Sequence, residues 1–432
     1  MTKAMPFLQK YDITFLRPPT IGRGFFFLLG CVKIKNMSDT MKARNGIMME
    51  RRLEEILSSI DELGQLSSQA MEEASARQEV LAKPTGALGE LEEISIRLAG
   101  ITGQVKNDVT KQAIVIFSAD NGVVEEGVAS APQSVTLSQT INFTRRLTGV
   151  GSMAKYFGID LLVVDVGVKM EIPEELYHDE MTEHQCSDNG CLQGITRRIV
   201  NRRIANGTKN LAKGPAMTRE EALTALYTGM EAVEALKRCG YQVFGVGEMG
   251  IGNTTTSACV LAALTDRTGE DVVGRGGGLN DEGFAKKIRI VDEAISRCKG
   301  KDVIDILAEA GGFDICAMVG AFLGAAYYKM PVVIDGYISA VAALAASRLA
   351  PKVTGFMFGS HVSKEKGYLI AMDALGVKPY FNLGMRLGEG SGCPISFKIM
   401  ETACAAMNGM ATFAEGAIDA DYLQEAKKGN FF

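Results

Sequence analysis

A glycine-rich loop near the C-terminal end of the chain contains a single acid, Glu389. The loop has the sequence GMRLGEGSG at residues 384–392 and follows an apolar stretch. Glycine adopts backbone conformations that are closed to other residues, and it lets a ligand approach the main chain closely. A carboxylate in such a loop could take a proton from a bound substrate, which is general-base chemistry. The alternative is a solvated turn in which the glutamate has no special role.

A second glycine-rich segment has the features of an anion-binding loop. Residues 245–256 read GVGEMGIGNTTT, and they leave a predicted strand and enter a predicted helix. Glycines let backbone N–H groups surround an anion, the N-terminus of a helix favours negative charge, and threonine hydroxyls add donors. The segment is not a Walker A loop, since no Gly-Lys-Ser/Thr follows, nor a clean dinucleotide fingerprint. A tight structural turn between strand and helix is the alternative.

A third loop, GRGGGLND at residues 274–281, precedes another predicted helix. Asn280 or Asp281 could cap that helix. Three successive glycines expose a row of amides, and Lys286 or Lys287 could reach a phosphate as a point charge from one or two turns into the helix. The alternative is a flexible linker followed by a solvated pair of lysines.

Other segments carry weaker signals. Residues 120–123 and 127–136 place polar groups on small residues, which suits the edge of an aromatic ligand pocket but also an ordinary turn. His361 follows a predicted strand and could line a pocket or be structural. His184, Cys186 and Cys191 are potential metal ligands close together in sequence. Because their spacing is not a recognised zinc pattern and a fourth ligand is missing, we expect an exposed loop without metal.

Alternating strands and helices must position these loops. The sequence predicts strands, each a short apolar run, over residues 113–117, 161–166, 242–246, 331–334, 355–358 and 380–383. It predicts helices between them over residues 219–237, 256–263, 284–297, 316–328 and 339–347. This alternation indicates an α/β fold with a mainly parallel sheet and helices on both faces. Ligands bind beyond the carboxyl ends of the strands in such sheets, where several of the loops would meet.

The two ends of the chain differ from this middle part. Apolar residues recur at helical spacing over 53–63, and further helices are expected over 67–81 and from Leu88 toward Gly100. Residues 1–47 are expected to be a disordered leader or the result of a start assigned too early. Their apolar run at 25–29 is far too short to span a bilayer.

The bulk composition excludes some partners. The 432 residues carry a net charge of -5 and have a pI near 5.6, so there is no electrostatic reason to expect nucleic-acid binding. The nine cysteines are scattered and form no disulfide-scaffold pattern, which indicates a reducing compartment. We therefore expect a cytoplasmic protein that acts on small molecules, away from membranes.

Four loops occur in the order and approximate spacing of one enzyme family. They are KPTGALG at residues 83–89, GEMGIGNTT at 247–255, GGFD at 311–314 and RLGEGSG at 386–392. On these motifs the chain resembles the nicotinate-nucleotide–dimethylbenzimidazole phosphoribosyltransferases, from about Met49 to about Gly416. The resemblance implies transfer of phosphoribose from nicotinate mononucleotide to 5,6-dimethylbenzimidazole or a related base. The products would be nicotinate and α-ribazole 5′-phosphate, used in assembly of the cobalamin nucleotide loop.

The resemblance also implies an architecture. A large Rossmann-like α/β domain is expected over residues 106–392. A small helical domain is expected from both chain ends, over residues 48–105 and 393–432. The family is typically homodimeric, and no cofactor or metal is expected.

The resemblance assigns roles to the matching residues. Glu389 is the expected general base, and Ser130, Gln139 and Leu387 are expected beside the acceptor base. Glu248 is expected near the donor, where it would position or stabilise an oxocarbenium-like ribose. The remaining substrate-binding residues, several of them at the phosphate, are Gly250, Gly252, Asn253, Thr254, Gly276, Gly277, Lys287, Asp314, Ser363 and Arg386.

The implied chemistry agrees with these residues. Nicotinate leaves as a neutral ring, so no acid or metal is needed to expel it. The acceptor attacks through one ring nitrogen, and the proton on its other nitrogen becomes strongly acidic as the bond forms. One carboxylate at hydrogen-bond distance therefore suffices as the base. Attack opposite to the departing ring inverts C1′.

Two other classes of function make different predictions. A nucleotide-dependent oxidoreductase would have a G-x-G-x-x-G loop at the first βα turn, where residues 118–122 read SADNG. A non-catalytic binder of benzimidazoles would tolerate the loss of Glu389, which is present with its loop intact. The sequence therefore favours the transferase.

Overall fold

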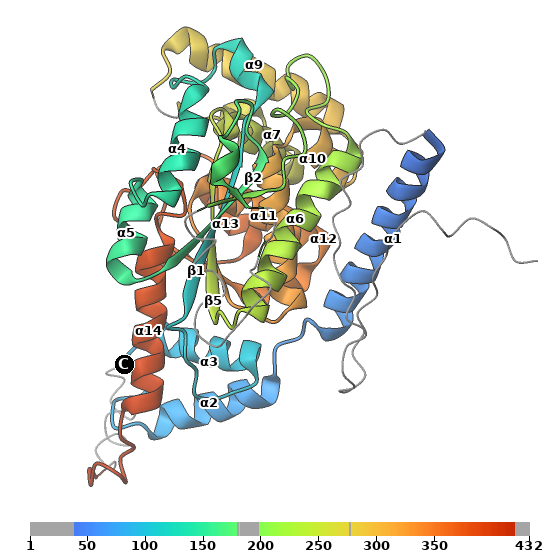
Figure 1. Ribbon diagram of the computed structural model, residues 1–432. Helices are drawn as coiled ribbons and strands as arrows, with labels where there is room; N and C mark the ends of the chain where they lie inside the picture. Colours follow the sequence, from blue (N-terminus) through green and yellow to red (C-terminus); the bar gives the residue numbers. More distant parts are fainter. Residues whose placement is uncertain (1–38, 179–180, 182–197, 276–277, 420–432) are drawn as a thin grey trace, which may run out of the picture. The chain divides into compact units, whose positions relative to one another are not determined.

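The computed structural model of the protein describes residues 39–178, 181, 198–275 and 278–419. A parallel sheet of seven strands forms its centre, in the order β3-β4-β2-β1-β5-β6-β7 (Figure 1). The strands are β1 (Gln112–Ala119), β2 (Asp160–Gly167), β3 (Tyr177–His178), β4 (Ile199–Asn201), β5 (Val243–Met249), β6 (Val332–Ile334) and β7 (Met357–Gly359). The predicted α/β class with a mainly parallel sheet is therefore confirmed.

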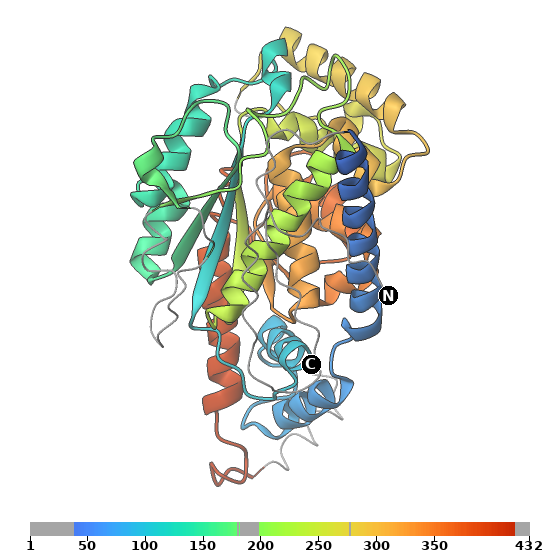
Figure 2. The same cartoon turned by 45° about the vertical axis from the view of Figure 1, so that its right-hand side comes forward.

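The central strands are apolar because both of their faces are covered. Every residue of β1 is buried, as expected for a parallel strand between two helical layers. Helices α4 (Ser134–Thr144), α5 (Gly149–Phe157) and α14 (Cys393–Gly409) cover one face, and α11 (Phe313–Tyr327) and α12 (Tyr337–Leu349) cover the other (Figures 1 and 2). Helix α6 (Arg219–Arg238) packs on α11, outside that second layer.

Two helices begin at the carboxyl end of the sheet or next to it. Helix α7 (Asn253–Thr265) follows β5, and α9 (Asp281–Cys298) packs against α7. Asn280 is the N-cap of α9 and accepts the N–H of Gly283, which confirms one of the two expected caps. The remaining helices of this part are α8 (Gly269–Val272), α10 (Val303–Ala310) and α13 (Tyr368–Leu375), with 3-10 turns η1 (Gly122–Glu126), η2 (Glu174–Leu176) and η3 (Pro351–Phe356).

The sheet has one topological switch point. The chain runs from β1 outward through β2 to the β3–β4 edge, then returns to β5 on the other side of β1 and continues to β7. In open α/β sheets, ligands bind beyond the carboxyl ends of the strands at such a reversal. The topology therefore directs attention to the loops that follow β1 and β5.

Helices from the two ends of the chain pack together. Helix α3 (Glu90–Thr102) contacts both α2 (Ser68–Val80) and α14 (Figure 1). Ala70, Ala74, Ala99 and Met407 form a small apolar cluster among them. Helix α1 (Asp39–Leu63) packs instead against α6 and α11, and the hydroxyl of Tyr227 donates to the carbonyl of Met49. The domain boundaries drawn from the sequence stay predictions.

Two details of the sheet differ from the expectation. Residues 380–383 form no strand: only Phe381 pairs, through a single parallel bridge to His361. The short edge strands β3 and β4 were not expected. None of the helices in the described residues combines the length and the apolar composition that a membrane crossing requires.

Candidate active site

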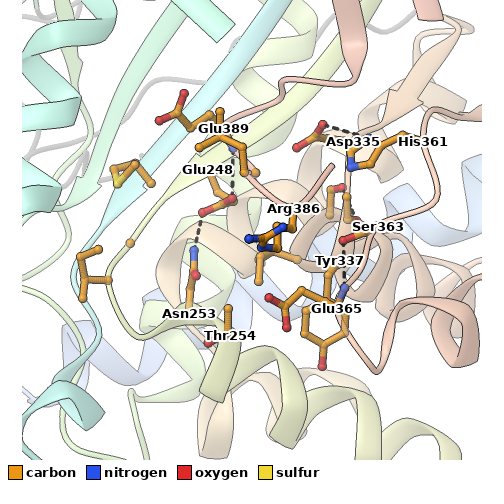
Figure 3. Close-up of a pocket in the computed structure, with 18 residues that line it drawn as sticks. Glu248, Asn253, Thr254, Asp335, Tyr337, His361, Ser363, Glu365, Arg386 and Glu389 are labelled. Carbon is orange, nitrogen blue, oxygen red and sulfur yellow. Dashed lines mark hydrogen bonds and ion pairs between the residues drawn. The ribbon is translucent and has the colours of Figure 1, made fainter. Parts of the chain in front are cut away.

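A pocket lies beyond the carboxyl ends of β5 and β6, at the side of the sheet that the topology indicates. Its walls come from the β5–α7 loop, the start of α12, the segment after β7 and the glycine-rich loop before α14 (Figure 3). The lining residues are Glu248, Met249, Gly250, Ile251, Asn253, Thr254, Asp335, Gly336, Tyr337, Ile338, Ser339, His361, Ser363, Glu365, Arg386, Leu387, Gly388 and Glu389.

Glu389 lies in the pocket wall in a strained backbone conformation. Its φ of 63° is in the left-handed region, which a non-glycine residue rarely adopts and which is enriched at functional sites. Its side chain accepts a hydrogen bond from Gln139 Nε2 (3.2 Å) and one from the N–H of Val150 (3.4 Å) in the first turn of α5. Burial raises the pKa of Glu389, whereas these donors act in the opposite direction.

The loop that carries Glu389 lies directly against β5. A Cβ added to Gly247 would lie 2.4 Å from the carbonyl oxygen of Glu389, so only glycine fits at that position of the strand. The N–H of Glu389 also donates to Glu248 Oε1 (3.4 Å), as Figure 3 shows. Two acids from distant parts of the chain are thereby brought into one pocket.

Glu248 ends a short chain of buried polar groups. Asn253 Nδ2 donates both to Glu248 Oε2 and to Asp314 Oδ2, the latter at 3.1 Å (Figure 3 shows the first bond). Burial, assisted by the charge of Asp314, raises the pKa of Glu248 to about 8. Burial likewise raises the pKa of Asp314 to about 6. The two carboxyl groups thus share one amide donor in a dry environment.

The start of α7 provides a site with donors for an anion. Gly252, with φ of 94°, precedes the helix, and Asn253 and Thr254 begin its first turn. The N–H groups of Asn253 and Thr255 already donate to the carbonyls of Gly250 (3.0 Å) and Gly252 (2.9 Å), so an anion here would be held by side chains and by the positive end of the helix. Lys287 Nζ donates to Thr254 Oγ1 (2.9 Å), and burial lowers the pKa of Lys287 to about 8. Lys286 turns away and pairs with Glu126 (3.0 Å).

Asp335 is a buried acid of the pocket that the sequence did not single out. It follows β6, and it accepts the N–H groups of Gly390 (3.0 Å) and Gly392 (2.6 Å). Burial, together with the charge of Glu389, raises the pKa of Asp335 to about 7. The only available signal was an acid at the end of a predicted strand, because its partners lie far away in sequence. His361 lines the pocket beside it, and burial lowers the pKa of His361 to about 4.

Most residues predicted from the sequence meet around this pocket. Eight of them line it: Glu248, Gly250, Asn253, Thr254, Ser363, Arg386, Leu387 and Glu389. Four others touch or adjoin the lining: Gln139, Gly252, Lys287 and Asp314. Ser130 is exposed and is not part of the lining. Sequence reasoning missed Tyr337 and Glu365, which carried no motif, in addition to Asp335.

Some predictions lie outside the described residues. The predicted substrate-binding residues Gly276 and Gly277 are not described by the structure. The segment with the potential metal ligands His184, Cys186 and Cys191 is not described either. Within the described ranges, no group of three or more histidine, cysteine or acidic side chains could hold a metal ion.

Buried acidic side chains without a basic partner gather at the pocket. Glu248, Asp314, Asp335 and Glu389 are all at least nine-tenths buried. In the part of the chain that the structure describes, no lysine or arginine forms an ion pair with any of the four. Buried carboxylates are normally paired with a positive charge. Where no such partner is present, burial disfavours the charged form and raises the pKa of the acid. The arrangement suits a ligand that brings an anion to α7 and positive charge to the acids.

Comparison with known proteins shows that the chain is a phosphoribosyltransferase. A family model described as Phosphoribosyltransferase matches residues 63–418. A nicotinate-nucleotide–dimethylbenzimidazole phosphoribosyltransferase of Clostridium perfringens strain 13 is 51% identical over 377 residues, which are 87% of this chain and 98% of the relative. A second relative of that name, from Clostridium tetani strain Massachusetts, is 42% identical. The match covers 88% of this chain and 99% of the relative.

Solved structures agree. The crystal structure of CobT from Thermus thermophilus has a TM-score of 0.74 and 36% identity, and the match covers 82% of this chain and 99% of that one. The chain belongs to the family of nicotinate-nucleotide–dimethylbenzimidazole phosphoribosyltransferases. It is thus an enzyme of the pentosyltransferase class that belongs to cobalamin biosynthesis.

Proposed function

We propose that the pocket transfers phosphoribose from nicotinate mononucleotide to 5,6-dimethylbenzimidazole or a related base, with Glu389 as the general base. The single observation that carries the proposal is the carboxyl group of Glu389, which is buried in the pocket wall and held by Gln139 and Val150. A group fixed in this way can meet the N–H of an acceptor ring without reorganising. The matching relatives bear the name of this reaction.

The donor would bind with its phosphate at the start of α7. The hydroxyl of Thr254 and the ammonium group of the buried Lys287 offer donors to a phosphate, and the positive end of α7 favours its charge. The nicotinate and ribose would then lie toward Glu248, on the side where the unpaired acids gather. A pyridinium ring and an oxocarbenium-like ribose are both cationic, and the acids would favour them electrostatically.

The transfer step balances without any further reactant. A lone pair of the acceptor nitrogen forms the new bond to C1′, while the C1′–N bond of the donor breaks and its electron pair stays on the pyridine nitrogen. The proton on the other acceptor nitrogen passes to Glu389. Attack from the face opposite to nicotinate inverts C1′ and gives the α-anomer. Exclusion of water from the pocket would prevent hydrolysis of the donor.

An assay of nicotinate release tests the proposal. Purified protein is given nicotinate mononucleotide with a panel of bases (dimethylbenzimidazole, benzimidazole, adenine and a phenol), and the ribotide product is analysed for its anomeric form. Glu389→Gln keeps the size of the side chain but removes its basicity, so we expect a loss of about 10²-fold or more in kcat. Glu79→Gln, an exposed glutamate of α2, is the control.

Three results would contradict the proposal. Full activity of Glu389→Gln would exclude the general-base role, and a β-anomeric product would exclude inversion. Absence of nicotinate release with every base would exclude the transfer itself. The homodimer implied by the resemblance stays a prediction.

A further inference from the structure

Asp335 holds the main chain that directly follows Glu389. Its Oδ2 accepts the N–H of Gly390 at 3.0 Å, and its Oδ1 accepts the N–H of Gly392 at 2.6 Å. Asp335 is 3% exposed, so both bonds are shielded from water. One carboxylate therefore fixes the C-terminal half of the glycine-rich loop.

The loop needs such a hold because Glu389 is strained. A left-handed conformation at a non-glycine residue persists only where its surroundings enforce it. On either side of the strained residue, Gly388 has φ of 82° and Gly390 has φ of 85°. These glycines can adopt many other conformations, so the sequence of the loop does not by itself favour the one observed.

Asp335 is itself fixed from behind. Ser360 Oγ donates to the main-chain carbonyl of Asp335 (2.5 Å) and lies 3.1 Å from His361 Nδ1. The same His361 nitrogen is 3.9 Å from Asp335 Oδ1, and Figure 3 shows the two side chains facing each other. A Cβ on Gly392 would lie 2.4 Å from His361 Nδ1, so the loop fits closely against this support.

We propose that Asp335 is the positioning residue for Glu389: by accepting the N–H groups of Gly390 and Gly392, it keeps the carboxylate of Glu389 at the place where the acceptor base loses its proton. This inference rests on the proposed function for its kinetic consequence but not for the hold itself. Asp335 does not need to touch the substrate to act in this way. Its two oxygens are already occupied by the loop.

Kinetics of Asp335→Asn test the consequence. Asparagine has an NH₂ group in place of one carboxylate oxygen of Asp335. This NH₂ group would face the N–H of Gly390 or Gly392, and because both groups are donors, one of the two hydrogen bonds is lost. Displacement of a catalytic group by about 1 Å can cost about 10²-fold in rate. We expect kcat to fall roughly 10- to 100-fold while KM for nicotinate mononucleotide changes less than about threefold, because the groups at α7 are untouched.

A double-mutant cycle separates positioning from a general weakening of the fold. If Asp335 acts through Glu389, Asp335→Asn causes no further loss of kcat in the Glu389→Gln background. Asp165→Asn is the matched control, since Asp165 is also a buried acid at a strand end that accepts two main-chain N–H groups, those of Gly167 (2.9 Å) and Val168 (2.7 Å). Additive losses in the cycle, or an equal loss of kcat in Asp165→Asn, would overturn the proposal.

Amide hydrogen exchange tests the hold without any reaction. Peptides that cover residues 388–392 should exchange faster in Asp335→Asn than in wild type, and at the wild-type rate in Asp165→Asn. Unchanged exchange in Asp335→Asn would refute the hold, whereas a wild type that releases no nicotinate would refute only the proposed function. If Asp335→Asn does not fold, Ser360→Ala, which removes the donor to the Asp335 carbonyl, should give the same pattern with smaller changes.

Discussion

Replacement of Lys287 by methionine is expected to strengthen the fold and to weaken donor binding. Lys287 is 1% exposed, and its Nζ donates to Thr254 Oγ1 at 2.9 Å. Burial lowers its pKa from 10.5 to about 8, although the negative charge of Glu365 acts in the opposite direction. At about 1.4 kcal/mol per pH unit, the buried ammonium group costs the fold about 3 kcal/mol. Methionine has a similar length and no charge to desolvate.

The size of this stabilisation depends on pH. The folded protein releases the proton near pH 8, and the unfolded chain releases it near pH 10.5. Between these values the unfolded chain binds more protons, so the stability of the wild type rises with pH. The cost is fully present below pH 8 and disappears above 10.5. The methionine variant should therefore be more stable by up to about 3 kcal/mol at about pH 7, and by about half of that at about pH 9.5.

Donor binding should change in the opposite direction. A hydrogen bond from a charged group contributes about 1.5–3 kcal/mol, so loss of the ammonium should weaken binding of nicotinate mononucleotide by about 10- to 150-fold. Thermal unfolding at these two pH values measures the first effect, and titration calorimetry with the donor measures the second. Lys286→Met is the control, because Lys286 pairs with Glu126 away from the pocket. A Lys287→Met variant that is less stable than wild type at neutral pH, or that binds the donor equally well, would refute this reasoning.

Two further predictions concern the support of the site. Gly247→Ala would place a methyl group 2.4 Å from the carbonyl oxygen of Glu389. We expect the free energy of unfolding, measured by chemical denaturation, to fall by about 1–3 kcal/mol, and kcat to fall as well. A variant with the kcat of the wild type would contradict this prediction. Arg219 joins Glu50 of α1 (2.6 Å) to Asp302 and Asp305 (2.8 Å each). Arg219→Gln should speed amide exchange in α1 with unchanged kcat, and equal exchange would contradict the role of this network.

The sequence predicted the centre of the fold because its signals are local. The expected strands at 113–117, 161–166, 242–246, 331–334 and 355–358 are confirmed as β1, β2, β5, β6 and β7. Each is a run of apolar residues that must be buried on both faces. The short β4 could not be found in this way, because it has only three residues and basic residues follow it. The expected strand at 380–383 is wrong because its aromatic residues pack at the edge, where only Phe381 pairs.

The site was predictable only in part, for the same reason. Glu389 and the loop at the start of α7 carry glycine patterns that mark close approach of the main chain, and both line the pocket. Asp335 has no such pattern: its role comes from two amide groups that lie 55 and 57 positions along the chain. The strain at Glu389 is also a property of the folded loop, since glutamate in a glycine-rich sequence does not require a positive φ.

The buried acids connect the stability of the protein to the charge of its ligand. Burial raises the pKa of Glu248 to about 8 from an ordinary value of 4.5, so the folded protein binds this proton more tightly than the unfolded chain does. Stability is therefore lost as pH rises from 4.5 through 8, where Glu248 must ionise in the pocket. A cationic ligand that sits beside Glu248 favours the ionised form and recovers part of that free energy. Binding of a pyridinium donor and ionisation of the pocket acids should consequently be coupled, so that the donor stabilises the fold more at about pH 8 than at about pH 6.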